Sequence, residues 1–221
     1  MQIIKSIEDM NRACREASRP LGLVPTMGAL HEGHLALVRK AHVENTTVAA
    51  TIFVNPSQFG ANEDLTLYPR DLDRDLDLLN DEGVDLVFTP TPEAIYPTRF
   101  NTWVDVGGLG EKLEGIHRPG HFRGVATVVA KLFNIVGPDR AYFGQKDGQQ
   151  TLVIRQLVRD LNLGLEVVIV PTVRETDGLA LSSRNAYLTP EQRRAAPVIY
   201  QSLCQAKEQW LNGERDAESL R

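Results

Sequence analysis

Apolar and β-branched residues gather in short runs that are bounded by Pro, Gly, Asn or Asp. Runs of this composition are typical of β-strands. They cover residues 21–25, 47–54, 84–89, 140–143 and 166–171. We therefore predict five strands, spread over most of the chain.

Between these runs the apolar residues recur at helical spacing. Leu35, Val38 and Ala41 form one stripe, and Leu72, Leu76 and Leu79 form another. The pattern predicts helices over residues 34–43, 71–79, 125–136 and 149–161. Strands that alternate with helices form βαβ units, so we expect an α/β fold with a largely parallel sheet.

Polar residues predict the structure of two further segments. Carboxylates stand at positions 71, 73, 75 and 77, among leucines whose helical spacing turns them inward. We expect most of these carboxylates to face solvent and interpret the stretch as a solvated helix face rather than a metal site. Thr189, Pro190 and Gln192 form a helix start with a capping Thr and a Gln three residues later. We expect that helix to run toward Gly213.

Composition narrows the class of protein. The 221 residues suffice for one sizeable α/β domain and part of a second. A net charge of -5 and a pI near 5.6 argue against a broad surface for nucleic acid or an anionic membrane. Cys14 and Cys204 lack disulfide or zinc-ligand spacing. With no signal peptide and no run of membrane-spanning length, a cytoplasmic protein is expected.

Residues 24–41 carry the most informative chemistry. A strand is predicted to end at Pro25, a turn contains Gly28 and Gly33, and a helix follows. Backbone N–H groups left free at a helix start, together with the helix dipole, favour a phosphate. His31 and His34 lie three residues apart, so both rings can donate hydrogen bonds to a triphosphate on one side. A zinc site is the weaker alternative, since no third ligand stands at suitable spacing.

Other polar clusters also follow predicted strands. Asn55 and Gln58 offer amides at the carboxyl end of a strand, where parallel sheets place ligands, although Asn-Pro-Ser is also an ordinary turn. Lys146 can neutralise phosphate, and Gln150 can face the same cleft. Residues 181–184 bring two hydroxyls and a guanidinium together. The Gly-rich basic segment 113–124 is either a mobile lid or a plain surface loop.

Six of these motifs together resemble the pantothenate synthetases, also called pantoate–β-alanine ligases. They are PTMGALHEGH, FVNPSQF, YPR at 68–70, RPGHFRGV, FGQKD followed by Gln150, and LSSRN, in this order and nearly end to end. Residues 31–34 are similar to the HxGH signature of a nucleotidyltransferase superfamily. The fold that this implies is a Rossmann-like catalytic domain, here 1–175, with the start of a smaller C-terminal domain at 176–221.

The resemblance implies ATP-dependent condensation of pantoate with β-alanine, with Mg²⁺, through a pantoyl adenylate, in a homodimer. By motif, His34, His31 and Lys146 would be catalytic, His34 as proton donor, although the residues themselves favour charge stabilisation. Gln58 and Gln150, with Asn55, would hold pantoate, and Gln58 would also border the β-alanine site. The implied ATP site comprises Pro25, Thr26, Met27, Gly28, Ala29, Leu30, His31, Glu32, Gly33, His34, Gly144, Gln145, Lys146, Asp147, Val173, Leu181, Ser182, Ser183 and Arg184.

Two departures from the family pattern bear on function. Gln145 stands where many members have Glu, which removes a charge but keeps an acceptor. The chain ends at Arg221, short of the usual length, so we expect a truncated C-terminal domain and reduced turnover. Two alternatives stay open at this point: another nucleotidyltransferase, or a noncatalytic nucleotide-binding or dimerisation fragment.

Overall fold

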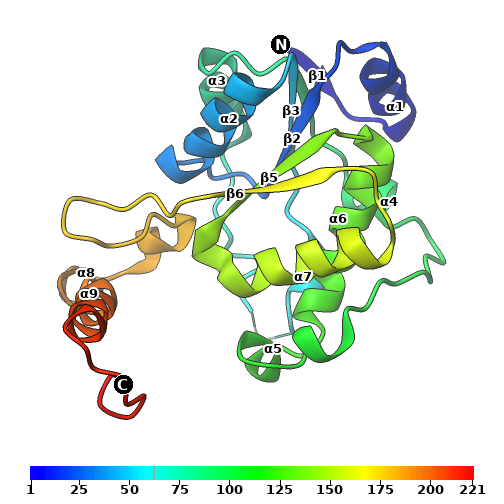
Figure 1. Cartoon of the computed structure of the whole chain (residues 1–221). Helices are drawn as coiled ribbons and strands as arrows, with labels where there is room; N and C mark the ends of the chain where they lie inside the picture. Colours follow the sequence, from blue (N-terminus) through cyan, green and yellow to red (C-terminus); the bar gives the residue numbers. More distant parts are fainter. Residues whose placement is uncertain (62) are drawn as a thin grey trace. The chain divides into compact units, whose positions relative to one another are not determined.

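The computed structural model describes residues 1–61 and 63–221 and resolves two compact units, Met1–Pro171 and Thr172–Arg221 (Figure 1). The first unit contains a parallel sheet with the order β1-β4-β3-β2-β5-β6. Its strands are β1 (Gln2–Ile4), β2 (Leu21–Thr26), β3 (Thr47–Ile52), β4 (Leu86–Phe88), β5 (Arg140–Gly144) and β6 (Glu166–Val170). The expected α/β fold with a parallel sheet is confirmed.

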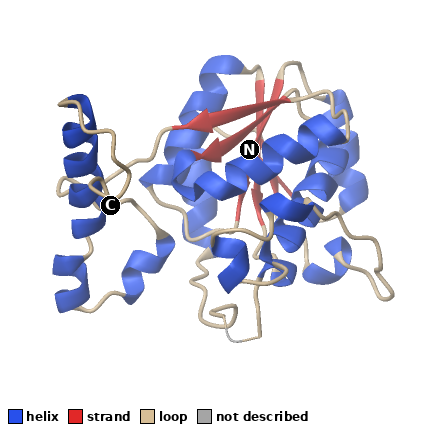
Figure 2. Cartoon of the chain, turned by 60° about the horizontal axis from the view of Figure 1, so that its bottom comes forward, coloured by secondary structure: helices blue, strands red, loops and turns tan. Residues whose placement is uncertain are grey.

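Helices cover both faces of this sheet (Figure 2). They are α1 (Ile7–Glu16), α2 (Glu32–Glu44), α3 (Leu72–Asp81), α4 (Pro92–Ile95), α5 (Glu114–His117), α6 (His121–Val136) and α7 (Gly148–Asp160), with 3₁₀ turns η1 (Pro56–Gln58), η2 (Gly107–Leu109) and η3 (Gln145–Asp147). Alternate strand residues face opposite helix layers: Leu23 and Phe143 pack with α1, α4, α6 and α7, whereas Val24 and Tyr142 pack with α2 and α3.

The order of the strands creates a switch point beside β2. The chain moves from β2 to β3 and β4 on one side, then returns to place β5 and β6 on the other side. The connections that leave β2 and β5 therefore diverge at the carboxyl edge of the sheet. In open parallel sheets, ligands bind where connections diverge in this way. The segments after β2, β3 and β5 carry most of the predicted site residues.

The structure corrects several predicted boundaries. Helix α2 begins at Glu32 rather than at residue 34, because His31 caps it with its own side chain. Strand β3 ends at Ile52, two residues before the predicted end, because the chain turns into η1. β1 and α1 were not predicted. Segment 113–124 is not a continuous loop, since α5 and the first turn of α6 lie within it.

The second unit has little regular structure before its helices. Arg174 and Ala180 form an antiparallel bridge, and Arg193 pairs with Glu175 at 2.6 Å and with Asp177 at 2.7 Å. Its elements are η4 (Ser183–Tyr187), α8 (Pro190–Ala195) and α9 (Val198–Leu211). The predicted capping box of Thr189 and Gln192 is confirmed. The predicted continuous helix is wrong, because it divides around Pro197 into α8 and α9.

Candidate active site

The predicted site residues of the first unit lie where three neighbouring strands end. Pro25 and Thr26 finish β2, Asn55 and Gln58 follow β3, and Gly144 finishes β5. The side-chain nitrogen of Gln58 lies 3.2 Å from the sulfur of Met27, so η1 touches the turn after β2. The segments after β2 and β3 therefore lie side by side at this edge of the sheet.

His31 and His34 form a reciprocal cap at the start of α2. The Nδ1 of His31 accepts from the backbone N–H of Gly33 at 3.1 Å, and the Nδ1 of His34 accepts from the N–H of His31 at 3.3 Å. The ring centroids lie 4.2 Å apart. Because each Nδ1 accepts, each neutral ring carries its proton on Nε2. The pair can therefore donate two hydrogen bonds to one ligand.

Both rings are held neutral by their surroundings. Burial lowers the pKa of His34 to about 3, and the neighbouring His31 and Lys146 add to the effect. Burial, followed by the charges of Lys146 and Arg74, also lowers the pKa of His31. A histidine with its pKa near 3 is not protonated at neutral pH, so it acts there as a hydrogen-bond donor rather than as a strong acid.

Asp75 fixes the turn that leads into this pair. Its carboxylate is 1% exposed and accepts from the backbone N–H groups of Ala29 and Leu30, both at 2.7 Å. Burial raises the pKa of Asp75, although the two N–H donors oppose that rise. Gly28 has φ +81°, and a Cβ there would lie 2.9 Å from the Asp75 carboxylate. The tight turn therefore requires glycine at position 28.

The expectation that backbone N–H groups are free in this turn is wrong for most of them. Besides the two that Asp75 binds, the N–H of Gly28 donates to the Thr26 hydroxyl at 3.2 Å. Those of His31 and Gly33 donate to the imidazoles. Side chains have satisfied the groups that a phosphate would otherwise use. An anion is left with the helix dipole, the two Nε2 protons and nearby cations.

Asn55 is buried behind Gln58 rather than exposed toward a ligand. Its Nδ2 donates to Gln58 Oε1 at 2.9 Å and to the Gly124 carbonyl at 3.3 Å. Its Oδ1 accepts from the hydroxyls of Tyr96 at 2.7 Å and Ser57 at 2.9 Å. With these four partners, the amide of Asn55 supports the side chain of Gln58.

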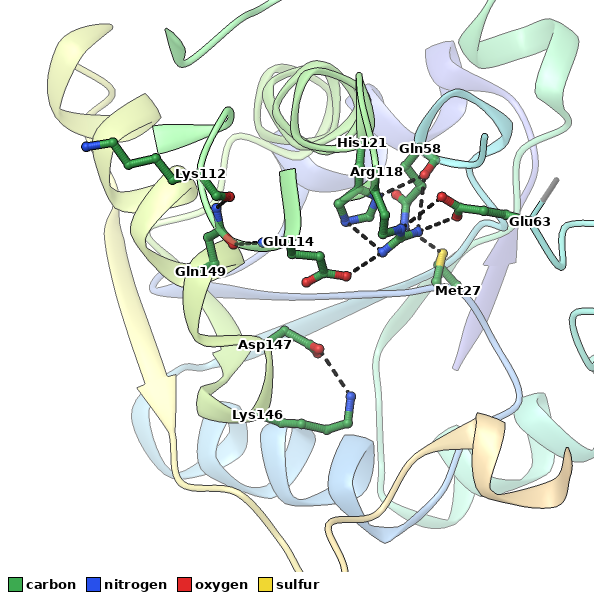
Figure 3. Close-up of polar contacts among 10 residues, drawn as sticks. All are labelled: Met27, Gln58, Glu63, Lys112, Glu114, Arg118, His121, Lys146, Asp147 and Gln149. Atoms are coloured by element: carbon green, nitrogen blue, oxygen red, sulfur yellow. Dashed lines mark hydrogen bonds and ion pairs between the residues drawn. The ribbon is translucent and has the colours of Figure 1, made fainter. Parts of the chain in front are cut away.

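Arg118 and His121 lie against the backbone of Gln58 (Figure 3). The Nδ1 of His121 is 2.8 Å from the Gln58 carbonyl, and Arg118 pairs with Glu63 at 2.5 Å and Glu114 at 2.8 Å. Burial lowers the pKa of His121. These contacts, all among described residues, anchor the segment that the sequence left open as a lid or a surface loop.

Lys146 lies in η3, where it pairs with Asp147 at 3.1 Å on the side of Met27 away from Arg118 (Figure 3). The positive charge of Lys146 lowers the pKa values of His31 and His34. Gln145 is exposed, and Gln150 is half-buried in the first turn of α7. Its neighbour Gln149 instead binds backbone groups at Leu109, Lys112 and Glu114.

The remaining predicted ATP residues belong to the second unit. Val173 accepts from the backbone N–H of Leu181 at 3.0 Å, and the hydroxyl of Ser182 accepts from the N–H of Arg184 at 3.3 Å. Ser183 begins η4. These contacts gather the predicted residues around one turn of this unit.

Sequence reasoning missed Asp75, Tyr96, Arg118 and His121 as individual site residues. A signal for Asp75 was present: it lies three residues after Leu72 and four before Leu79, on the leucine face of α3. That spacing favours burial. The sequence offered no comparable signal for the pairing of His121 with Gln58, which lie 63 positions apart.

Residues 1–61 and 63–221 lack two features that bear on function. They contain no cluster of three or more His, Cys, Asp or Glu side chains that could hold a metal ion. No helix within the same ranges has the length and apolar character needed to cross a membrane.

Comparison with known proteins extends this picture. The family described as pantoate-beta-alanine ligase matches residues 2–221. Pantothenate synthetase of Chloroflexus aggregans is 62% identical over 221 residues, which is all of this chain and 79% of that protein. The Thermotoga neapolitana enzyme is 57% identical over 224 residues, with 80% of its length covered.

Solved structures agree with the sequences. Pantothenate synthetase from Thermus thermophilus superposes with a TM-score of 0.97 at 55% identity, covering 100% of this chain and 80% of that one. The pantoate-beta-alanine ligase of Francisella tularensis, complexed with beta-gamma ATP and beta-alanine, gives a TM-score of 0.87 at 40% identity, covering 91% and 78%. From its six motifs, its fold and these matches, the chain belongs to the pantoate-beta-alanine ligase family.

Proposed function

We propose that this chain joins pantoate to β-alanine at the expense of ATP, through a pantoyl adenylate, and releases AMP and pyrophosphate. The observation that carries the proposal is the pair of neutral imidazoles, His31 and His34, whose Nε2 protons are left for a ligand. The Francisella tularensis relative, which was solved with an ATP species and β-alanine, supports the same pair of substrates.

In the first step, a carboxylate oxygen of pantoate attacks the α-phosphorus of ATP, and the bond to pyrophosphate breaks. Negative charge grows on the bridging and terminal oxygens as the bond breaks. Donors that are already in place stabilise that charge without reorganisation. We assign this role to His31, His34 and Lys146, whose mobile ammonium group can follow the phosphate.

In the second step, the amine of β-alanine attacks the carbonyl carbon of the mixed anhydride. The C–N bond forms, AMP leaves with the carboxylate-derived oxygen, and the amine loses its proton. Both steps need correctly positioned substrates and no protein nucleophile. We assign the pantoate site to Gln58 and Gln150, with Asn55 behind Gln58, and Gln58 also borders the site of β-alanine.

The rest of the ATP site is assigned by motif. In the first unit it comprises residues 25–34 and 144–147, and in the second unit Val173 and residues 181–184. Arg184 would supply a guanidinium for phosphate oxygens. The alternative of a noncatalytic fragment requires binding of nucleotide without turnover.

Magnesium fits this site as an ion carried by ATP. Asp75, the buried acidic side chain at the turn, already accepts two backbone N–H groups. Mg²⁺ commonly binds substrate phosphates and water, with only one or two carboxylates. Asp147, a carboxylate within the segment assigned to ATP and paired with Lys146, would join such a shell. The ion would neutralise phosphate charge.

A homodimer in the cytoplasm completes the proposal. Cys14 and Cys204 are both free thiols, which suits a reducing compartment. The mass of the particle in solution, measured by light scattering, tests the dimer against a monomer of 24.6 kDa.

The decisive experiment measures pyrophosphate release from ATP with pantoate alone, and AMP release after β-alanine is added. We expect pyrophosphate to require pantoate, and AMP to require both substrates. Nicotinamide mononucleotide serves as the competing acceptor for the other nucleotidyltransferase hypothesis. ATP binding without pyrophosphate release would favour the noncatalytic fragment and contradict the proposal.

A further inference from the structure

The side-chain amide of Gln58 can present either its oxygen or its nitrogen to a ligand. Its Oε1 accepts from Asn55 Nδ2 at 2.9 Å, and its Nε2 faces the sulfur of Met27 at 3.2 Å. Thioether sulfur is a weak acceptor, so an oxygen ligand can readily take over the Nε2 protons. In this orientation Gln58 is a hydrogen-bond donor.

The orientation is set by a chain of hydrogen bonds behind Gln58. Asn55 Nδ2 also lies 3.3 Å from the Gly124 carbonyl, which can only accept, so nitrogen must occupy that position. The Asn55 oxygen then faces Tyr96, whose hydroxyl donates to it at 2.7 Å. A rotated Asn55 would place its NH₂ against the backbone N–H of Ser57, which now donates to its oxygen at 3.3 Å, and its oxygen against two acceptors.

A second contact holds the backbone of Gln58. Its carbonyl oxygen is 2.8 Å from His121 Nδ1 and 3.4 Å from Arg118 Nη2. Because a carbonyl accepts, Nδ1 of His121 carries a proton, and its Nε2 accepts from Arg118 Nη1 at 3.2 Å. Arg118 is itself held by Glu63 and Glu114, as Figure 3 shows.

We propose that Tyr96 and His121 are positioning residues that fix Gln58 as a hydrogen-bond donor to the hydroxy-acid substrate. Tyr96 acts through Asn55 on the side chain, and His121 acts on the carbonyl. This inference rests on the proposed function, in which Gln58 contacts pantoate. A hydrogen-bond donor at this position suits the carboxylate and hydroxyl oxygens of the substrate. Because the side chain of Gln58 is already held in place, substrate binding does not have to order it.

The variants Tyr96→Phe, His121→Leu and His121→Asn test this inference. Phe removes one hydroxyl with little change of shape. Leu removes the donor to Gln58, whereas the amide nitrogen of Asn can take the place of Nδ1. Tyr142→Phe is the matched control, because that hydroxyl is also bonded, to Asn45 at 2.6 Å and Glu44 at 2.9 Å, in a buried tyrosine away from the site.

Pyrophosphate release is measured with pantoate and ATP varied in turn, and the melting temperature of each variant is recorded. We expect Tyr96→Phe to raise the KM for pantoate about fivefold and His121→Leu about tenfold, with the KM for ATP within about twofold. His121→Asn should recover most of the loss. Tyr142→Phe should change the melting temperature and leave both KM values near those of the parent.

Two results would overturn the inference. One is an unchanged KM for pantoate in Tyr96→Phe. The other is a pair of His121 variants that are equally impaired for pantoate and ATP, which would indicate a general structural role. If instead the parent chain releases no pyrophosphate with pantoate, the proposed function itself fails, so the two failures are distinguishable.

Discussion

The rings of His31 and His34, 4.2 Å apart, each turn Nδ1 toward a backbone N–H group and leave Nε2 for a ligand. Their charge state decides what they do there. Because the pKa of His34 is held near 3, proton transfer from an imidazolium is a minor route at neutral pH. The role that we propose for the pair is therefore donation of hydrogen bonds to the departing pyrophosphate.

We therefore expect His34→Ala to lower the rate of adenylate formation at least about tenfold, a loss of roughly 1.4 kcal/mol in transition-state stabilisation. His34→Gln, which keeps an N–H near the position of Nε2, should retain more activity than His34→Ala. Single-turnover pyrophosphate release measures both, with the exposed His117→Ala as control. An inactive Gln variant, with a parent rate that falls as pH rises through 6 to 7, would favour proton donation.

The buried histidine also links folding to pH. The pKa of His34 is about 3 in the folded state and 6.5 in its unperturbed form, so the unfolded chain binds the extra proton between these values. The contribution to stability is complete above pH 6.5 and is lost as the pH falls toward 3. One extra proton bound by the unfolded chain corresponds to a slope of about 1.4 kcal/mol per pH unit in the free energy of unfolding.

Urea unfolding of the parent and of His34→Gln between pH 4.5 and 7.5 measures this contribution. The parent should lose stability more steeply than the variant on acidification. Subtracting the two curves cancels groups that both proteins share, including Asp75, whose raised pKa acts in the opposite direction. If the two curves of stability against pH are parallel, the pKa of His34 is not lowered in the folded state.

Asp75 should matter for both stability and catalysis. In Asp75→Asn, one backbone N–H of the turn faces an NH₂ group instead of an acceptor. We expect a loss of about 1–3 kcal/mol in the free energy of unfolding, together with slower adenylate formation. Asp77→Asn, an exposed position on the same helix, should stay within about 0.5 kcal/mol. Equal effects at the two positions would contradict the role given to Asp75.

The contact between α6 and η1 leaves no room at Gly124. A Cβ there would lie 2.3 Å from the Ser57 carbonyl, so Gly124→Ala must push the helix away from Gln58. We expect a loss of about 1–3 kcal/mol in stability and a higher KM for pantoate. Gly148→Ala is the control, because its Cβ would meet nothing within 4 Å. Its stability should be equal or up to about 1 kcal/mol higher.

Calorimetry and steady-state kinetics of the two glycine variants give both quantities. If Gly124→Ala melts with the parent and binds pantoate normally, then α6 and η1 can separate without consequence.

The parts of the fold that were predictable are those with long apolar patterns. β2, β3, β4, β5 and β6 follow from runs of apolar residues, and α2, α3, α6 and α7 from helical spacing. β1 contains only two apolar residues, Ile3 and Ile4, which is too few for a pattern. The division of the last helix around Pro197 was readable from proline but was overlooked.

The candidate site was predictable only where one segment carries it. Local spacing placed the rings of His31 and His34 on one side of the helix start but did not reveal the reciprocal cap that they form, and the resemblance named further residues. Tyr96, Asn55 and Gln58 come together through tertiary packing, as do His121 and Gln58. Such pairings depend on how α4 and α6 lie on the sheet, which residue types and their spacing do not reveal.

The switch point beside β2 has a consequence for engineering. In the first unit, the segments assigned to the nucleotide follow β2 and β5, whereas Gln58 and its supports follow β3 and enter from α4 and α6. On the proposed assignment, Gln58 and its supports thus lie on parts of the chain that carry none of the residues assigned to the nucleotide, although Gln150 follows β5. We expect libraries built around η1 and the start of α6 to change which acids are accepted, while adenylation itself is retained.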